Sequence, residues 1–261
     1  MTRALLGGLL SRGTAPASIT VSAPSEATRS TLVQQFGVNA TADNRAAVAG
    51  ARIVVLSVKP QVMEDVVRPL AATLGQSRPL VISVAAGIRV ADLKAWLGEG
   101  IPVVRSMPNR PALVGAGATG LYAGAEVGDG DRALAEELLA AAGIAVWVQE
   151  EAQLDLVTAL SGSGPAYFFR LAELMAEAAS AEGLDAGVAR RLAAQTLAGA
   201  GRMVAAESAP DLAAMRAAVT SKGGTTAAAL ARFDELGLGE TVREAMRAAA
   251  SRSRELAGGG R

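Results

Sequence analysis

The residues best suited to chemistry lie in one polar stretch, Val219 to Leu230, with the sequence VTSKGGTTAAAL. Its paired glycines, Gly223 and Gly224, let the backbone turn freely. The alanine-rich run that follows predicts a helix beginning at Thr225 and Thr226, where several unpaired backbone N–H groups point outward together. Such a helix end can bind a small carboxylate through its N–H donors and dipole, with two threonine hydroxyls beside it. The alternative, which this stretch alone favours, is an ordinary loop with a capped helix.

The composition excludes several kinds of chemistry. The 261 residues are 51% hydrophobic, enough for a large core and typical of two domains, and 25 basic residues balance 25 acidic ones. This balance indicates neither a nucleic-acid tract nor an anionic-membrane partner. Without cysteine there is no disulfide or thiolate, and without histidine there is no imidazole base or metal ligand. We therefore expect no metal, and acid–base chemistry falls to lysine, carboxylate, tyrosine, hydroxyl groups or water.

The N-terminus imitates a signal peptide, because Arg3 precedes an apolar run over residues 4–10 and a small-residue motif over residues 15–17. The run is short and is broken by Gly7 and Gly8, so we interpret it as part of a cytoplasmic domain. No stretch approaches the roughly 18 apolar residues that a membrane helix requires.

Strand-like and helix-like stretches alternate over the first 150 residues. We predict strands at 18–22, 38–41, 52–58, 80–85, 103–107, 118–122 and 145–148, and helices at 2–10, 26–36, after 43–44, 62–74, 90–97 and 131–142. The run RIVVLSV over 52–58 is typical of a strand buried on both faces of a parallel sheet. The alternation predicts an α/β domain over 1–150, with a doubly wound, mostly parallel sheet.

Ligands of such sheets bind at the carboxyl ends of the strands. The predicted ends carry Lys59-Pro60-Gln61, Ala85-Ala86-Gly87 and Met107-Pro108-Asn109, which are small, polar or turn-forming. Each taken alone reads as a strand terminator. Three of them in one sheet favour an edge that approaches a ligand.

From residue 151 the strand pattern disappears, and residues 151–261 are predicted to form an all-α domain. Helices are expected at 153–159, 164–181, 186–206, 210–219, 226–236 and 241–256. Their apolar faces exceed what one short bundle can bury, so we expect them to pack against a second copy of the chain, as a homodimer or a larger assembly of dimers.

Five strings, in order along the chain, resemble the pyrroline-5-carboxylate reductase family. They are VVLSVKPQVM at 54–63, SVAAGI at 83–88, VVRSMPNRPALVGAG at 103–117, LVTALSGSGPAYFF at 156–169 and VTSKGGTT at 219–226. The pairing of SGSGPAY with the later serine-x-glycine-glycine-threonine loop is highly specific. In SGSGPAY we favour a packing role for the glycines over polar contacts from Ser161 and Ser163.

The resemblance implies a Rossmann domain that binds NAD(P)H and a helical domain that forms an intertwined dimer, with substrate between the cofactor and the glycine-threonine loop. It implies that the enzyme reduces 1-pyrroline-5-carboxylate to L-proline, the last step of proline biosynthesis. The cofactor-binding residues that it implies are Asn44, Val58, Lys59, Pro60, Ala85, Ala86 and Gly87. The residues that it implies for binding the substrate carboxylate are Ser221, Gly223, Gly224 and Thr225. Thr226 would be the catalytic residue and form a hydrogen bond with the ring nitrogen. Because a cyclic imine is basic, water near neutrality can protonate it and no strong acid is required.

The chain departs from the family pattern at its start, since family members begin with a strand and a G-x-G-x-x-G loop. We expect the central first strand of the sheet to be missing, with its pyrophosphate-binding turn. The explanations are a start codon assigned too late, a chain that was cut, or a natural loss of cofactor binding. The third would make this a non-catalytic, dimer-forming homologue. A second alternative is a reductase of another cyclic imine.

Two further departures add positive charge. Arg110 stands where the family usually has threonine, and Lys222 where it has proline before the paired glycines. They either face solvent, as most such side chains do, or strengthen anion capture.

The choice of cofactor depends on the residues after the strand at 18–22. They include no acidic residue to hold the 2′-hydroxyl of NAD, whereas Ser22, Ser25 and Arg29 could contact a 2′-phosphate. We therefore expect NADPH, with NADH as the alternative.

Overall fold

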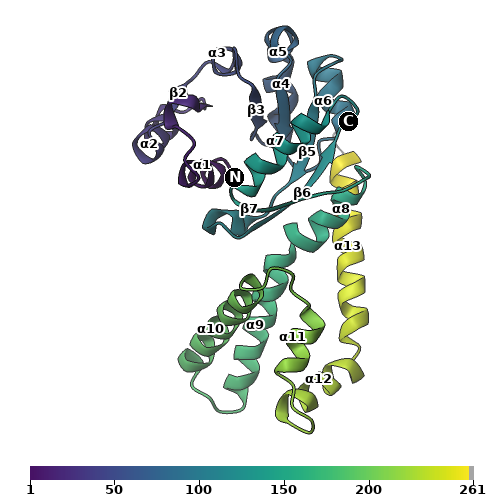
Figure 1. Ribbon diagram of the computed structural model, residues 1–261. Coiled ribbons are helices and arrows are strands. Elements are labelled where there is room, and N and C mark those ends of the chain that lie inside the picture. The colour runs from purple at the N-terminus through teal and green to yellow at the C-terminus, as the bar shows by residue number, and fades with distance from the viewer. Residues whose placement is uncertain (259–261) are drawn as a thin grey trace. The chain divides into compact units, whose positions relative to one another are not determined.

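The computed structural model describes residues 1–258, which form two compact units (Figure 1). Of the described residues, the first unit contains 1–163 and 249–258, and the second contains Gly164–Ala248. These units differ in extent from the predicted domains, because residues 151–163 and the last helical turns group with the sheet. The division at residues 150 and 151 stays a prediction.

The strands of the first unit form two sheet segments. Strand β1 (Thr20–Ser22) pairs with β2 (Asn39–Thr41), and the larger segment has the order β3-β4-β5-β6-β7. Its strands are β3 (Ile53–Leu56), β4 (Leu80–Ser83), β5 (Val103–Met107), β6 (Gly117–Ala123) and β7 (Gly143–Trp147). All neighbours are parallel except β5 and β6, which confirms a mostly parallel sheet. Within residues 1–258 no pairing joins β1 to β3.

The prediction that residues 52–58 are buried on both faces holds only in part for β3, because its second face is covered incompletely. Val54 and Leu56 are buried, whereas Ile53 and Val55 are half-buried. The reason is the position of β3 at the edge of the five-stranded segment, where only β4 supplies a neighbouring strand.

Eight α-helices within residues 1–163 pack around the sheet or connect its strands. They are α1 (Thr2–Ser11), α2 (Glu26–Phe36), α3 (Asn44–Val48), α4 (Met63–Val67), α5 (Ala71–Ser77), α6 (Val90–Leu97), α7 (Asp129–Ala140) and α8 (Gln153–Val157). The single helix predicted over 62–74 is wrong, because a 3-10 turn at Arg68–Leu70 separates α4 from α5. Pro69 lies in that turn, and a proline inside a helix removes one N–H donor and crowds the preceding turn.

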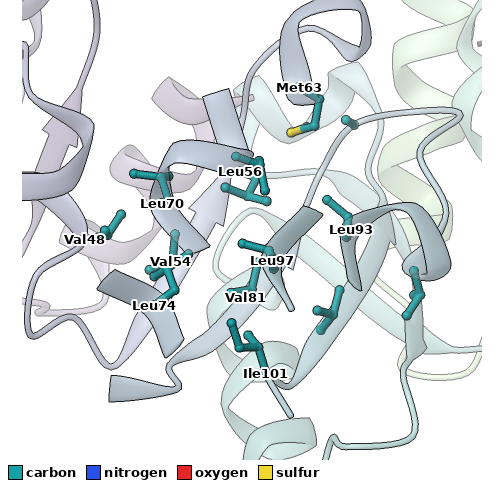
Figure 2. Close-up of a cluster of buried hydrophobic side chains, with 14 residues drawn as sticks. Val48, Val54, Leu56, Met63, Leu70, Leu74, Val81, Leu93, Leu97 and Ile101 are labelled. Carbon is teal, nitrogen blue, oxygen red and sulfur yellow. The ribbon is translucent and has the colours of Figure 1, made fainter. Parts of the chain in front are cut away.

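Hydrophobic clusters cover both faces of the larger sheet segment. On one face, Val54, Leu56 and Val81 pack with residues of α4, α5 and α6, as Figure 2 shows. On the other face, α1 and α7 contribute residues such as Leu5 and Leu139. This arrangement of helices on both faces confirms the predicted doubly wound architecture.

The second unit is entirely helical, which confirms the prediction for this part of the chain. It contains α9 (Gly164–Ala181), α10 (Ala186–Ala205), α11 (Leu212–Ala218), α12 (Thr225–Glu235) and the first turns of α13 (Leu238–Gly258). Many of its large apolar side chains are exposed, among them Phe168 at 61% and Leu192 at 56%. Among the helices that the structure describes, none is long and apolar enough to cross a membrane.

Candidate active site

Two predicted cofactor-binding segments lie at the same edge of the sheet. Strands β3 and β4 are parallel and in register, with Leu56 opposite Ser83, so the residues that follow them emerge side by side. These residues are Val58–Pro60 after β3 and Ala85–Gly87 after β4. Gly87 has a φ of +79°, a conformation that glycine adopts without strain. Ala85 and Ala86 have small side chains and Gly87 has none, so these strand ends fit a dinucleotide that contacts the backbone.

Asn44 lies at the end of the smaller sheet segment, as the first residue of α3. Its Oδ1 accepts a hydrogen bond from the Ser22 hydroxyl at the end of β1. The adjoining loop is held by Arg29, whose guanidinium donates to the carbonyls of Ala23 at 2.7 Å and Pro24 at 2.8 Å. A polar group and a cation therefore flank the end of β1.

The third strand end, Met107-Pro108-Asn109, is fixed by the buried side chain of Asn109. Its Nδ2 donates to the carbonyl of Ser161 at 2.9 Å, and its Oδ1 accepts from the N–H of Ala118, also at 2.9 Å. Ser161 belongs to a π-helical turn, Thr158–Gly162, and such turns occur often at functional sites. Sequence reasoning placed Asn109 at the edge of the sheet but missed its role as the link to SGSGPAY.

The first glycine of SGSGPAY packs closely against the same strand end. A Cβ placed on Gly162 would lie 2.8 Å from the terminal methyl group of Met107, whereas one on Gly164 would meet nothing within 4 Å. The Ser161 hydroxyl donates to the Val157 carbonyl at 3.0 Å. These contacts give the segment a packing function.

A buried ion pair joins the sheet to the turn before α8. Glu151 Oε1 accepts from Arg105, in the middle of β5, at 3.1 Å and from the N–H of Val90, at the start of α6, at 2.8 Å. The Arg105 side chain is only 7% exposed. An arginine in the middle of the buried strand VVRSM was the available signal for this pair, and sequence reasoning missed it.

A second partly buried pair, Lys94 with Glu126, connects α6 to the loop after β6. The hydrogen bond from Lys94 lowers the pKa of Glu126 below its ordinary value, because it favours the charged carboxylate. A lowered pKa in the folded state means that the unfolded chain binds the proton more tightly. The pair therefore stabilises the fold in full above the ordinary glutamate pKa of about 4.3, and this contribution is lost as the pH falls through the lowered value.

We expect Glu126→Gln to reduce the pH dependence of the free energy of unfolding below about pH 5. The measurement is urea unfolding at a series of pH values. Glu64→Gln is the control, because Glu64 pairs with Arg68 on an exposed helix surface where such pairs contribute little. A pH profile that is the same for Glu126→Gln and wild type would contradict this role.

In the second unit, the glycine-threonine loop leads into α12, which begins at Thr225, one residue before the start of the predicted helix 226–236. Gly223 has a φ of +72°, and the N–H of Gly224 donates to the Ser221 carbonyl at 3.1 Å to close a tight turn. A Cβ on Gly224 would lie 2.4 Å from the Ser221 hydroxyl oxygen. The positive φ favours glycine at position 223, and a side chain at position 224 would displace the Ser221 hydroxyl.

The start of α12 offers free hydrogen-bond donors. No side chain caps it, whereas Asp185 caps α10 and Asp211 caps α11. Within residues 1–258 the hydroxyls of Thr225 and Thr226 form no hydrogen bond, although helical threonines such as Thr196 bond to a carbonyl one turn earlier. These features favour the anion-binding interpretation over the ordinary capped helix.

The structure thus assembles two groups of predicted residues, each inside one unit. The first unit brings together the ends of β3 and β4 and holds Asn44 beside Ser22, and the second holds Ser221–Thr226 in one turn. Arg110 and Lys222 are both exposed. In the part of the chain that the structure describes, neither forms a side-chain hydrogen bond or ion pair.

Comparison with known proteins gives two family matches. Residues 151–256 match the family described as pyrroline-5-carboxylate reductase dimerisation, and residues 1–87 match NADP oxidoreductase coenzyme F420-dependent. A pyrroline-5-carboxylate reductase of Pseudomonas aeruginosa is 47% identical over 98% of this chain and 93% of the relative.

Solved structures of pyrroline-5-carboxylate reductases are also similar to this chain. A pyrroline-5-carboxylate reductase from Coxiella burnetii is similar with a TM-score of 0.93 and 38% identity, covering 98% of this chain and 94% of that one. A pyrroline carboxylate reductase from Plasmodium falciparum, solved with NADP bound, has a TM-score of 0.78 and 26% identity, covering 97% and 93%.

Proposed function

The chain belongs to the pyrroline-5-carboxylate reductase family, and we propose from this premise that it reduces 1-pyrroline-5-carboxylate to L-proline with NADPH. The observation that carries the proposal is the uncapped start of α12, with two free threonine hydroxyls behind a glycine turn. The match of residues 1–87 to an NADP oxidoreductase family supports the cofactor. We place the enzyme in the cytoplasm, because its relatives are biosynthetic enzymes.

The loop of the second unit is suited to the substrate carboxylate. The N–H groups of Thr225, Thr226 and Ala227 occupy the first turn of α12, where no intrahelical carbonyl is available to them. The positive end of the helix dipole adds to their attraction for an anion. With Ser221 and the two glycines, these groups would hold a carboxylate in one orientation.

Thr226 would then orient the ring nitrogen through its hydroxyl. When bound at the strand ends, the nicotinamide would supply hydride to the imine carbon. The chain's own residues would supply mainly position, since holding reacting atoms in alignment can lower a barrier by about 7–11 kcal/mol. The residues after β3 and β4, with Asn44, would fix the cofactor.

The proposal is tested by titrating the chain with NADPH, followed by fluorescence, and by measuring proline formed from pyrroline-5-carboxylate. A version extended upstream is titrated in parallel. If the chain reduces a different cyclic imine faster than pyrroline-5-carboxylate, the result would favour the alternative function, a reductase of another cyclic imine. A dimer that binds no dinucleotide in either version would favour the non-catalytic alternative.

We expect Arg29→Ala to weaken NADPH binding more than NADH binding. Arg29 is anchored to two loop carbonyls at the end of β1, where a guanidinium can pair with a 2′-phosphate. Loss of a hydrogen bond to a charged group corresponds to about a tenfold smaller preference for NADPH. Dissociation constants for both dinucleotides measure it, with the exposed Arg52→Ala as control. An equal loss for both cofactors would rule out this role.

The second unit would form a homodimer and, by extension, a larger assembly of dimers. Its apolar side chains are exposed along α9 and α10, including Leu174, Met175 and Leu192, and a hollow of about 1000 Å³ lies between these helices. Surfaces of this kind mark subunit interfaces. The match of residues 151–256 to a dimerisation family supports the same partner.

Leu192→Glu is therefore expected to shift the chain toward monomer, because the interface would bury an unpaired charge. Sedimentation velocity at several concentrations measures the shift. Gln76→Glu introduces the same charge on an exposed position of α5 and should leave the association unchanged. A Leu192→Glu chain that associates as tightly as wild type would place the interface elsewhere.

A further inference from the structure

The last turns of α13 lie against one of the strand ends described above. A Cβ placed on Gly87 would be 3.5 Å from the Leu256 carbonyl oxygen and 3.7 Å from the Ala257 Cα, which is ordinary van der Waals contact. Ala250, one and a half turns earlier, is only 2% exposed. Residues 256 and 257 of α13 thus lie beside the loop that follows β4.

A buried carboxylate holds these turns in place. Asp155, on α8, is 6% exposed, and its Oδ1 accepts a hydrogen bond from the Ser253 hydroxyl at 2.6 Å. The two residues are 98 positions apart in the sequence. Burying a carboxylate is costly unless hydrogen bonds compensate, so this contact stabilises both partners. Because α8 itself is packed against β6, Asp155 is a fixed point for the end of α13.

The loop at Ala85–Gly87 depends on this support. Gly87 has a positive φ and no side chain, so the other residues of the loop restrict its backbone conformation little. A Cβ built on Gly87 would have the backbone of Leu256 and Ala257 as its nearest neighbours outside the loop. If the end of α13 moves away, the loop gains freedom, and any ligand that binds its backbone must then restrict it again.

We propose that Asp155 and Ser253 are positioning residues for the cofactor site: their hydrogen bond holds the last turns of α13 against Gly87 and so pre-forms the loop after β4. The inference rests on the proposed function, since it takes that loop to be part of the dinucleotide site. The pair contacts neither substrate nor cofactor.

The test compares Ser253→Ala, Asp155→Ala and Asp155→Asn with wild type. Asparagine keeps an oxygen that can accept from Ser253, so Asp155→Asn should restore the contact that alanine removes. Ser251→Ala is the matched control, because Ser251 is exposed on the same helix and has no side-chain hydrogen bond in the described part of the chain. Two quantities are measured: amide hydrogen exchange over residues 249–257, and the dissociation constant and KM for NADPH beside kcat.

In both alanine variants the amide hydrogens of residues 249–257 should exchange faster than in wild type. Their KM and dissociation constant for NADPH should rise about threefold to tenfold, the equivalent of one lost hydrogen bond, with kcat within about twofold of wild type. Asp155→Asn and Ser251→Ala should behave like wild type in both measurements. A role in stability alone would not raise the dissociation constant of the folded protein.

The proposal is overturned if exchange is unchanged in the alanine variants, or if exchange rises while NADPH binding stays as in wild type. It is also overturned if Ser251→Ala has the same effect. Wild-type protein that binds no NADPH would instead refute the proposed function, so the two failures are distinguishable.

Discussion

Replacement of Thr226 by valine is expected to lower kcat for the reduction of 1-pyrroline-5-carboxylate by about 10- to 100-fold. Valine keeps the shape of the side chain and removes only the hydroxyl. That hydroxyl lies in the uncapped first turn of α12 and forms no hydrogen bond within residues 1–258, so it is available to the ring nitrogen. A hydrogen bond to a charged group is worth about 1.5–3 kcal/mol, which corresponds to this range of rates.

Steady-state kinetics with saturating NADPH measure the effect, and the dissociation constant for NADPH should stay unchanged. Thr241→Val is the control, because the Thr241 hydroxyl bonds to the Gly237 carbonyl in the first turn of α13. A Thr226→Val enzyme that turns over at the wild-type rate would remove Thr226 from the mechanism. The anion-binding role of the backbone N–H groups would be unaffected by that result.

Gly8→Ala is expected to lower the free energy of unfolding by about 3 kcal/mol, as overpacking of a rigid contact does. A Cβ on Gly8 would lie 2.1 Å from the carbonyl oxygen of Ala141 and 2.6 Å from its carbon, so backbone must move. Helix α1 packs on two clusters at once, through Leu5 on the larger sheet segment and Leu6 on the smaller one. A displaced α1 would therefore disturb both.

Gly7→Ala is the matched control, one residue earlier in the same helix. A Cβ on Gly7 would have only Phe36 Cε1 near it, at 4.0 Å, so alanine should fit and raise stability by about 0.5–1 kcal/mol. Urea unfolding at one fixed protein concentration measures both variants, since association contributes to apparent stability. Equal stability of the two variants would show that α1 does not lie as close to Ala141 as described.

Elements with local signals were predicted well from the sequence. Helix α2 has the predicted bounds, because Ser25 can cap its start and Gly37, at a φ of 69°, can end it in the left-handed conformation. The start of α12 was predicted from the paired glycines, which let the backbone turn before the alanine-rich run. The residues after β3 and β4 were placed at one edge because parallel strands carry their carboxyl ends together.

The structure corrected predictions that depended on neighbours. The run at 52–58 is fully buried on one face and only half-buried on the other, because β3 lies at an edge that the strand's own sequence does not reveal. The interruption of the predicted helix 62–74 had a local signal, Pro69 itself. The apolar pattern on both sides of Pro69 nevertheless led to the prediction of one continuous helix. The residue pattern of β6 fits a parallel strand and an antiparallel strand equally well. The packing of the whole chain made β6 antiparallel to β5.

The sequence by itself determined the fold class, the glycine-threonine loop and the residue types at the strand ends, since these follow from backbone preferences and hydrophobic patterns within short windows. Only the tertiary structure decided which buried polar groups pair: Asn109 with Ser161, Arg105 with Glu151, and Asp155 with Ser253. These partners lie between 46 and 98 residues apart. A buried polar side chain must find a partner, but which partner is near depends on how the whole chain packs.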